Sequence, residues 1–166
     1  MSLKALIQAI YRQGGTGIKV NRAAANDAVG PTAIFTITGG LVLVTGLTGT
    51  VTVVRTGGAG VTQLFSHSTG PTALCVAGIT GLAAVGTTIT ITGDPADPLI
   101  VGVGTGVANT FAPIQGGMKG SGAGGVSQFG LICGVGTITT TISIATTGAT
   151  RYCLTYIPLD DGAAVN

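Results

Sequence analysis

The chain has 166 residues, of which 30 are glycine and only 7% are Asp, Glu, Lys or Arg, and its formal net charge is +2. A soluble domain usually gives about a quarter of its residues to these charged types, so we expect neighbouring molecules to cover much of this surface. The sparse bases form no stripe for nucleic acid, and no apolar run reaches the roughly 18 residues that a membrane span needs. We therefore expect neither nucleic acid nor a membrane as a partner.

The first 30 residues are predicted to form a short helix followed by an extended arm. Apolar residues recur at helical spacing from Leu3 to Tyr11, and Gly14-Gly15 would end the helix. Residues 16–30 have no clear period. A helix this short needs a surface to lie on, either its own β-domain or a neighbouring subunit. The residues that we expect to dock on a partner are Leu3, Lys4, Leu6, Ile7, Ile10, Tyr11, Arg12, Lys19 and Arg22.

From residue 31 to residue 166 the pattern is typical of one β-domain. Apolar residues alternate with Thr or Ser in short runs, and Gly, Pro and Asp separate the runs. This pattern predicts an all-β fold, an antiparallel β-sandwich or jelly-roll-like domain, preceded by the helix and arm of residues 1–30. The predicted strands are 32–38, 41–45, 50–55, 61–66, 73–77, 87–92, 99–103, 126–133, 137–145 and 151–157.

Two long stretches of the chain, 28–54 and 120–150, contain no charged residue. Thr takes the place of Lys or Glu on the second face of the predicted strands, which keeps the β propensity high while removing charge. Long uncharged strands with free edges would promote aggregation of a monomer. We therefore expect closure of the sheets or association with other subunits to cover these edges.

Candidate catalytic residues are few. His67 is the single histidine, the chain has no glutamate, and no Gly-x-Ser-x-Gly elbow surrounds a serine. Neither a Ser-His-Asp relay through His67 nor a nucleophilic pair of Cys75 with His67 is favoured. We expect His67 to be a loop or surface residue and Cys75 to pack in the core, so the sequence predicts that the protein is not an enzyme.

The candidate ligands of a metal or cofactor also lack the required spacing. No C-x-x-C pair joins the cysteines, which favours core thiols over a disulfide or zinc site. The acidic clusters at 94–97 and 160–161 offer too few oxygens for calcium and are typical of turns. Residues 120–125 match G-x-G-x-x-G without a preceding strand or a following helix, which indicates a loop. We expect no cofactor and no metal. The cysteines are Cys75, Cys133 and Cys153.

Three stretches together resemble a family of tailed-bacteriophage structural proteins. They are residues 38–52 (TGGLVLVTGLTGTVT), residues 73–75 (ALC) and the closing residues 156–163 (YIPLDDGA). In such proteins the first stretch is a strand that leads into a hairpin, and the closing octet is the most specific element. The resemblance covers residues 33–163, with 98–125 unlike the family.

The resemblance implies a structural virion protein, a trimeric capsid decoration (cement) protein that binds and stabilises the phage head. Its implied partners are the major capsid protein and further copies of itself, and its implied place is the capsid surface after synthesis in the host cytoplasm. It implies no catalytic residue. The alternative is a host-surface or glycan-binding module of a head or tail fibre, which the few aromatic residues, mostly inside predicted strands, disfavour.

Overall fold

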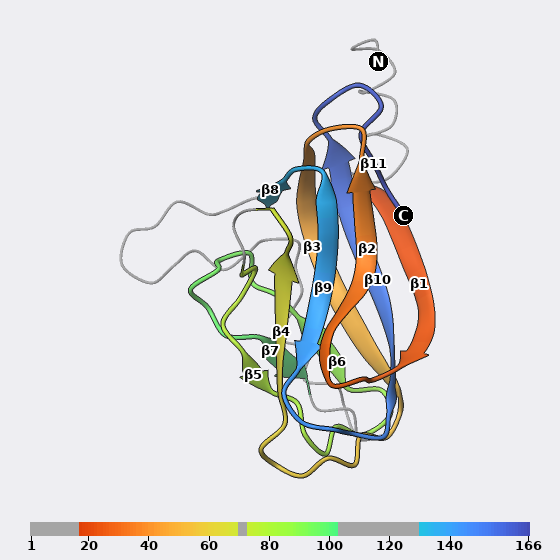
Figure 1. Cartoon of the computed structure of the whole chain (residues 1–166), viewed down its shortest axis with the longest axis vertical. Coiled ribbons are helices and arrows are strands. Elements are labelled where there is room, and N and C mark those ends of the chain that lie inside the picture. Colours follow the sequence, from red (N-terminus) through yellow and green to blue (C-terminus); the bar gives the residue numbers. More distant parts are fainter. Residues whose placement is uncertain (1–16, 70–72, 103–129) are drawn as a thin grey trace.

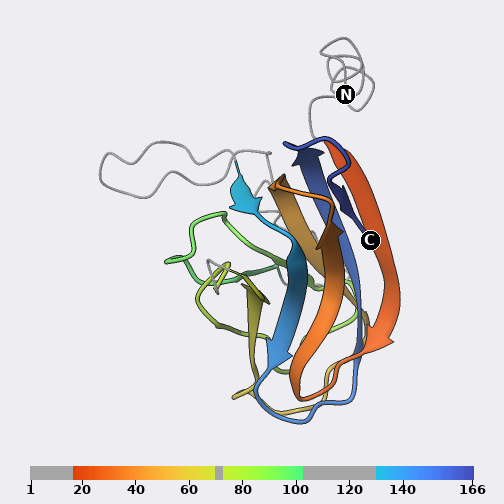
Figure 2. The same cartoon turned by 45° about the horizontal axis from the view of Figure 1, so that its top comes forward.

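The computed structural model describes residues 17–69, 73–102 and 130–166, and over these residues the chain is all-β. Its strands form two antiparallel sheets that lie face to face as a sandwich (Figures 1 and 2). Sheet A has the order β1 (Ile18–Asn26), β10 (Ala149–Pro158), β3 (Val42–Val53), β6 (Thr88–Thr90) and β7 (Ile100–Gly102), with β8 (Leu131–Cys133) also paired to β3. Sheet B has the order β11 (Ala164–Val165), β2 (Gly30–Thr38), β9 (Gly136–Ile142), β4 (Thr62–His67) and β5 (Gly78–Ile79).

The strand pairs are nested along the chain. β1 pairs with β10, β2 with β9, β3 with β6 and β4 with β5, and successive pairs alternate between sheet A and sheet B. The pairs β10–β3 and β9–β4 then complete the two sheets. This nesting is the double Greek key of a jelly roll, so the predicted all-β, jelly-roll-like fold is confirmed.

The core lies between the two sheets because each strand turns alternate side chains inward. On β3 the inward residues Val42, Val44, Leu47 and Val51 are fully buried. Burying one such side chain stabilises the fold by roughly 1.5–3 kcal/mol. An edge-to-face ring contact between Phe65 of sheet B and Tyr152 of sheet A, with centroids 5.9 Å apart, joins the two layers. The sandwich is therefore held mainly by contacts between residues far apart in the sequence.

The prediction of two strands at 41–45 and 50–55, joined by a hairpin, is wrong. β3 runs unbroken from Val42 to Val53. Gly46 and Gly49 lie inside this strand because the neighbouring strand leaves no room for a side chain: a Cβ would lie 2.8 Å from Thr155 Oγ1 at Gly46 and 3.0 Å from the Tyr152 ring at Gly49. These glycines allow a close approach of β10 and do not mark a turn.

The segment 73–77, predicted as a strand, has only isolated bridges, from Ala73 to Ser66 and from Val76 to Pro98. The segment 16–30 was expected to be an extended arm, whereas Ile18–Asn26 is strand β1, paired with β10 along its length. The helix expected from Leu3 to Tyr11 lies outside the described residues. The division into residues 1–30 and 31–166 stays a prediction, within which 18–26 belong to sheet A. Within the described residues no helix could cross a membrane.

Four loops meet at one end of the sandwich, the lower end in Figure 1: β1–β2 (27–29), β3–β4 (54–61), β5–β6 (80–87) and β9–β10 (143–148). Backbone hydrogen bonds join them, from Asp27 N to Gly148 O and from Thr56 N to Thr147 O, each 3.0 Å. We call this end the loop end. Gly17, where the described structure begins, lies at the opposite end because β1 runs from Ile18 there to Asn26 at the loop end.

Candidate functional site

Charge is distributed unevenly over the two sheets. The strands of sheet B contain no Asp, Glu, Lys or Arg, whereas β1 and β10 of sheet A carry Lys19, Arg22 and Arg151. The acidic residues Asp94, Asp97, Asp160 and Asp161 lie in turns. We call the outer surface of sheet B the uncharged face. Residues that contribute to it include Ala33, Thr36, Leu64, Ser66, Thr137, Thr139, Thr141 and Ile79.

Two hydroxyl groups on the uncharged face are hydrogen-bonded to each other. The hydroxyls of Ser66 and Thr139, which face each other across β4 and β9, are 2.7 Å apart. Thr137 and Thr141 continue the same row along β9 and are half-buried. A hydroxyl that already has a partner loses little when water is removed, whereas an unpaired one costs about 1–3 kcal/mol. The face is therefore suited to contact with another dry protein surface.

The loop end is uncharged and apolar on its outside. Six large aliphatic side chains of the loops or of the strand ends beside them are about half exposed or more: Val29, Val53, Val54, Leu82, Val85 and Ile144. The four loops contain two charged residues, Asp27 and Arg55, and both are buried. Clustered exposed aliphatic residues of this kind mark interaction surfaces more often than scattered single ones do.

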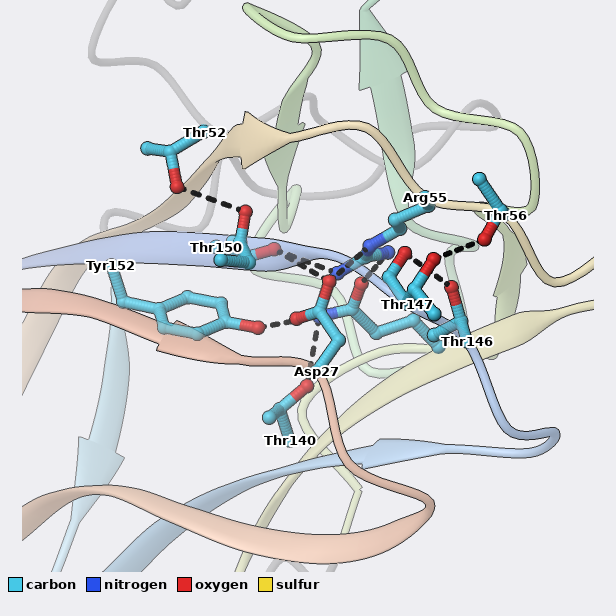
Figure 3. Close-up of polar contacts among 11 residues, drawn as sticks. Asp27, Thr52, Arg55, Thr56, Thr140, Thr146, Thr147, Thr150 and Tyr152 are labelled. Atoms are coloured by element: carbon cyan, nitrogen blue, oxygen red, sulfur yellow. Dashed lines mark hydrogen bonds and ion pairs between the residues drawn. The ribbon is translucent and has the colours of Figure 1, made fainter.

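A buried polar network lies directly beneath the loop end, and Figure 3 shows its members converging on the Arg55 guanidinium. Arg55 donates from Nε to Asp27 Oδ2 (2.7 Å), from Nη1 to Gln63 Oε1 (2.7 Å) and from Nη2 to Thr150 Oγ1 (2.9 Å). The Thr150 hydroxyl in turn donates to Asp27 Oδ2 over 3.2 Å. Arg55 is 0% exposed, so these bonds supply the partners that a buried charge requires.

The amide of Gln63 extends the network into sheet B. Its Nε2 donates to Thr140 Oγ1 (2.8 Å) and to the Tyr152 hydroxyl (3.2 Å). Burial raises the pKa of the Tyr152 phenol, and the nearby Asp27 carboxylate adds to this shift, while its hydrogen bonds and Arg55 oppose it. Tyr152 therefore stays neutral and accepts this hydrogen bond across the sandwich.

Arg55 also holds the four loops together. Its backbone N–H donates to Ala83 O of the β5–β6 loop over 3.0 Å, and its side chain reaches Asp27 at the start of the β1–β2 loop. At Gly148, in the β9–β10 loop, a Cβ would lie 2.9 Å from Arg55 Cγ, so only glycine leaves room there. The apolar loops are therefore fixed in place by one buried side chain and its backbone.

Leu82 has an unusual backbone conformation at the tip of the β5–β6 loop. Its φ of 59° is the one positive value at a non-glycine position in the described part of the chain, and its side chain is 62% exposed. The left-handed region costs a residue like leucine about 1–3 kcal/mol. The neighbouring bond from Gly86 N to Val51 O (2.9 Å) ties the same loop to β3. The fold thus accepts a strained backbone while presenting an apolar side chain to the outside.

Of the residues predicted to dock on a partner, the structure describes two. Lys19 is exposed on β1, opposite Thr155, and the Arg22 guanidinium donates from Nη1 to Ala33 O, which links sheet A to sheet B. A cavity of about 220 Å³ lies beside Arg22, with Val20, Phe35 and Asn166 in its wall. Arg22 therefore makes a structural contact within the sandwich. The others, Leu3, Lys4, Leu6, Ile7, Ile10, Tyr11 and Arg12, lie outside the described residues.

His67 is buried at the end of β4, so the expectation of a loop or surface residue is wrong. Its Nδ1 accepts from Thr69 N over 3.2 Å, and its Nε2 has no hydrogen-bond partner among the residues that are described. Burial also raises the pKa of the Cys75 thiol and raises that of Cys133 to about 11, which keeps both protonated and unreactive. Across 17–69, 73–102 and 130–166, no three His, Cys, Asp or Glu residues gather as metal ligands.

The predicted turn at 94–97 is present, because Asp94 Oδ1 accepts from Ala96 N over 2.9 Å. The aromatic residues Phe35, Phe65, Tyr152 and Tyr156 are all buried, so none of these rings is free to stack on a sugar.

Comparison with known protein families, curated proteins and solved structures finds no match to this chain.

Sequence reasoning missed both the Arg55 network and the loop end. One signal was present: Asp27 and Arg55 have opposite charges and bracket the uncharged stretch 28–54. The pairing itself was not predictable from spacing, because Arg55 meets Gln63 8 residues away and Thr150 95 residues away.

Proposed function

We propose that this chain is a structural protein of a tailed-phage virion, a capsid decoration protein that acts as a homotrimer on the head. The observation that carries the proposal is the uncharged face of sheet B, which matches the expectation of a covered surface drawn from composition. The closing octet, residues 156–163, supports the same assignment through its resemblance to phage structural proteins. The partners are then the major capsid protein and other copies of this chain.

The proposed mechanism is stabilisation by binding. A protein that binds the assembled shell, and not its dissociated subunits, shifts the equilibrium toward the shell by mass action. The uncharged face would lie on the shell, where the paired hydroxyls of Ser66 and Thr139 lose little on desolvation. A charged face would be penalised for burial unless every charge found a partner.

The N-terminal residues Leu3 to Arg12 stay the candidate arm that reaches onto the capsid. The arm would leave the sandwich at Gly17, next to the exposed Lys19 on β1. Because β1 is part of sheet A, the arm must be tested by removing residues 1–16 alone. A deletion through Asp27 would also remove β1 and the partner of Arg55.

The direct test is the copy number of the chain in purified particles. A decoration protein is present in tens to hundreds of copies, whereas a fibre module is present in a few. Capsids that lack the chain should bind purified protein and then resist heat better. Absence of the chain from purified heads would refute the proposal.

Substitutions on the two sheets supply the matched control. Thr139→Lys and Thr141→Lys place a charge on the uncharged face and should abolish binding to such capsids. Asn21→Lys places the same charge at an exposed position of β1 in sheet A and should leave binding unchanged. Equal loss of binding in all three variants would show that the uncharged face is not the docking surface.

A further inference from the structure

We infer that the loop end is the surface through which copies of this chain associate with one another. The number of copies, three, rests on the proposed function, whereas the position of the surface rests on the structure alone. In a trimer each loop end would meet the loop ends of its two neighbours near the three-fold axis. The occupant of this apolar surface is thus a second copy of the same chain.

The composition of the loop end favours self-association. Val54, Leu82 and Val85 lie on segments joined by backbone hydrogen bonds, and their side chains are 46%, 62% and 54% exposed. Removing such aliphatic surface from water contributes about 25 cal/mol per Å². Most of the residues named on the uncharged face of sheet B are Thr or Ser, so that face gains less from the same contact. Of these two surfaces, the loop end therefore offers the stronger apolar contribution to association.

The charge distribution selects a second copy as the partner. The charged residues of these loops, Asp27 and Arg55, are paired with each other inside the fold, so the loop end offers no charge to an ionic partner. A matching surface must itself be aliphatic and uncharged, and another loop end has this composition. Contact through sheet A would instead bring together Lys19 and Arg151 of different copies, and like charges repel within a Debye length of about 8–10 Å.

The loop end is also organised before association. Arg55, which is part of the β3–β4 loop, contacts the other three loops through its side chain and backbone, so little conformational entropy remains to be lost when copies meet. Leu82 holds its side chain outward at φ 59° against a backbone preference. A glycine there would remove the strain, so the leucine is better explained by a contact that its side chain makes.

Sedimentation equilibrium of the purified full chain tests the inference. The wild type should associate with rising concentration, and Leu82→Asp and Val54→Asp should each weaken association by about tenfold or more, because each buries an unpaired charge. The matched control is Ile132→Asp, since Ile132 on β8 is 58% exposed but lies away from these loops. The control should associate like the wild type.

A second variant distinguishes a loss of association from a loss of folding. Leu82→Gly relieves the backbone strain and removes the apolar side chain, so it should melt no lower than the wild type at concentrations where both are monomeric, yet associate more weakly. The inference is overturned if the wild type stays monomeric, if the loop-end variants associate normally, or if the control loses association equally. Particle copy number tests the proposed function separately, so either idea can fail alone.

Discussion

Arg55 and Asp27 form an ion pair of 2.7 Å between Nε and Oδ2, with side chains only 0% and 2% exposed. They flank the uncharged stretch 28–54 in the sequence. The strands between them, β2 and β3, run in opposite directions along the sandwich, so both residues lie at the same end. A buried pair of this kind is a poor source of net stability compared with apolar packing, but breaking it by removing one partner is costly. Its contribution here is to set where the four loops meet.

Arg55→Ala should lower the free energy of unfolding by about 3–5 kcal/mol, because it strands the Asp27 carboxylate without its cation. Urea denaturation followed by circular dichroism measures the loss. The double variant Arg55→Met with Asp27→Leu should lose clearly less than the sum of its two single variants, because no buried charge remains. Additive losses would show that the two residues do not act as a pair.

Gly49→Ala should destabilise the fold by about 1–3 kcal/mol, because overpacking forces neighbouring groups to shift. The new Cβ would lie 3.0 Å from the Tyr152 ring and 3.2 Å from Thr150 Cγ2. Gly60→Ala is the control, since a Cβ there meets nothing within 4 Å, and it should change stability by less than about 0.5 kcal/mol. Thermal melts measure this difference by comparing the melting temperatures of both variants with that of the wild type. Equal melting temperatures would contradict the close approach of β10 to β3.

Stability should fall as the pH rises from 9.0 to about 11, because burial raises the pKa of Cys133 over that range. The folded state keeps the thiol protonated while the unfolded chain ionises it near its ordinary pKa of 9.0, so the stabilising effect is complete below that pH and is lost above it. Urea midpoints across this window should decline less steeply in Cys133→Ala than in the wild type. Parallel slopes would show that Cys133 does not contribute.

Asp160 links the closing octet to the β2–β3 turn, since its Oδ2 accepts from Leu41 N over 2.7 Å. Asp160→Ala should cost about 1 kcal/mol, as loss of a side-chain cap on a backbone N–H usually does. Asp160→Asn keeps an acceptor oxygen and should recover most of the loss. The comparison is made by chemical denaturation, and a loss in Asp160→Asn as large as in Asp160→Ala would point to the charge instead of the hydrogen bond.

The fold class could be predicted from the sequence because, on strands such as β9, buried and half-buried residues alternate, and this alternation shows which face of the strand is buried. Thr137, Thr139 and Thr141 alternate with the buried Ile138, Thr140 and Ile142, and this order needs no knowledge of partners. β1 escaped prediction because it is an edge strand whose second half, Ala23 to Asn26, has no apolar alternation. Its pairing with β10 is a tertiary effect that local propensity does not report.

The candidate surfaces were less predictable than the fold. Composition led us to expect that neighbouring molecules cover the protein, but it did not distinguish sheet B from sheet A, since that distinction depends on strand order. The loop end consists of four segments from distant parts of the chain, and the left-handed conformation of Leu82 follows from the bonds around it. His67 is buried at the end of β4, and the glycine-rich segment 120–125 lies outside the described residues.

The nested pairing of strands has a consequence for biosynthesis. Ile18 pairs with Tyr156, far along the chain, so the pair of β1 and β10 cannot form until residue 156 has been synthesised. Folds dominated by such distant pairings mature in milliseconds to seconds, and until then the uncharged strands stay open to wrong partners. Until β10 is made and paired, the uncharged strands of an unfinished copy can therefore pair with other chains instead of with their own partners.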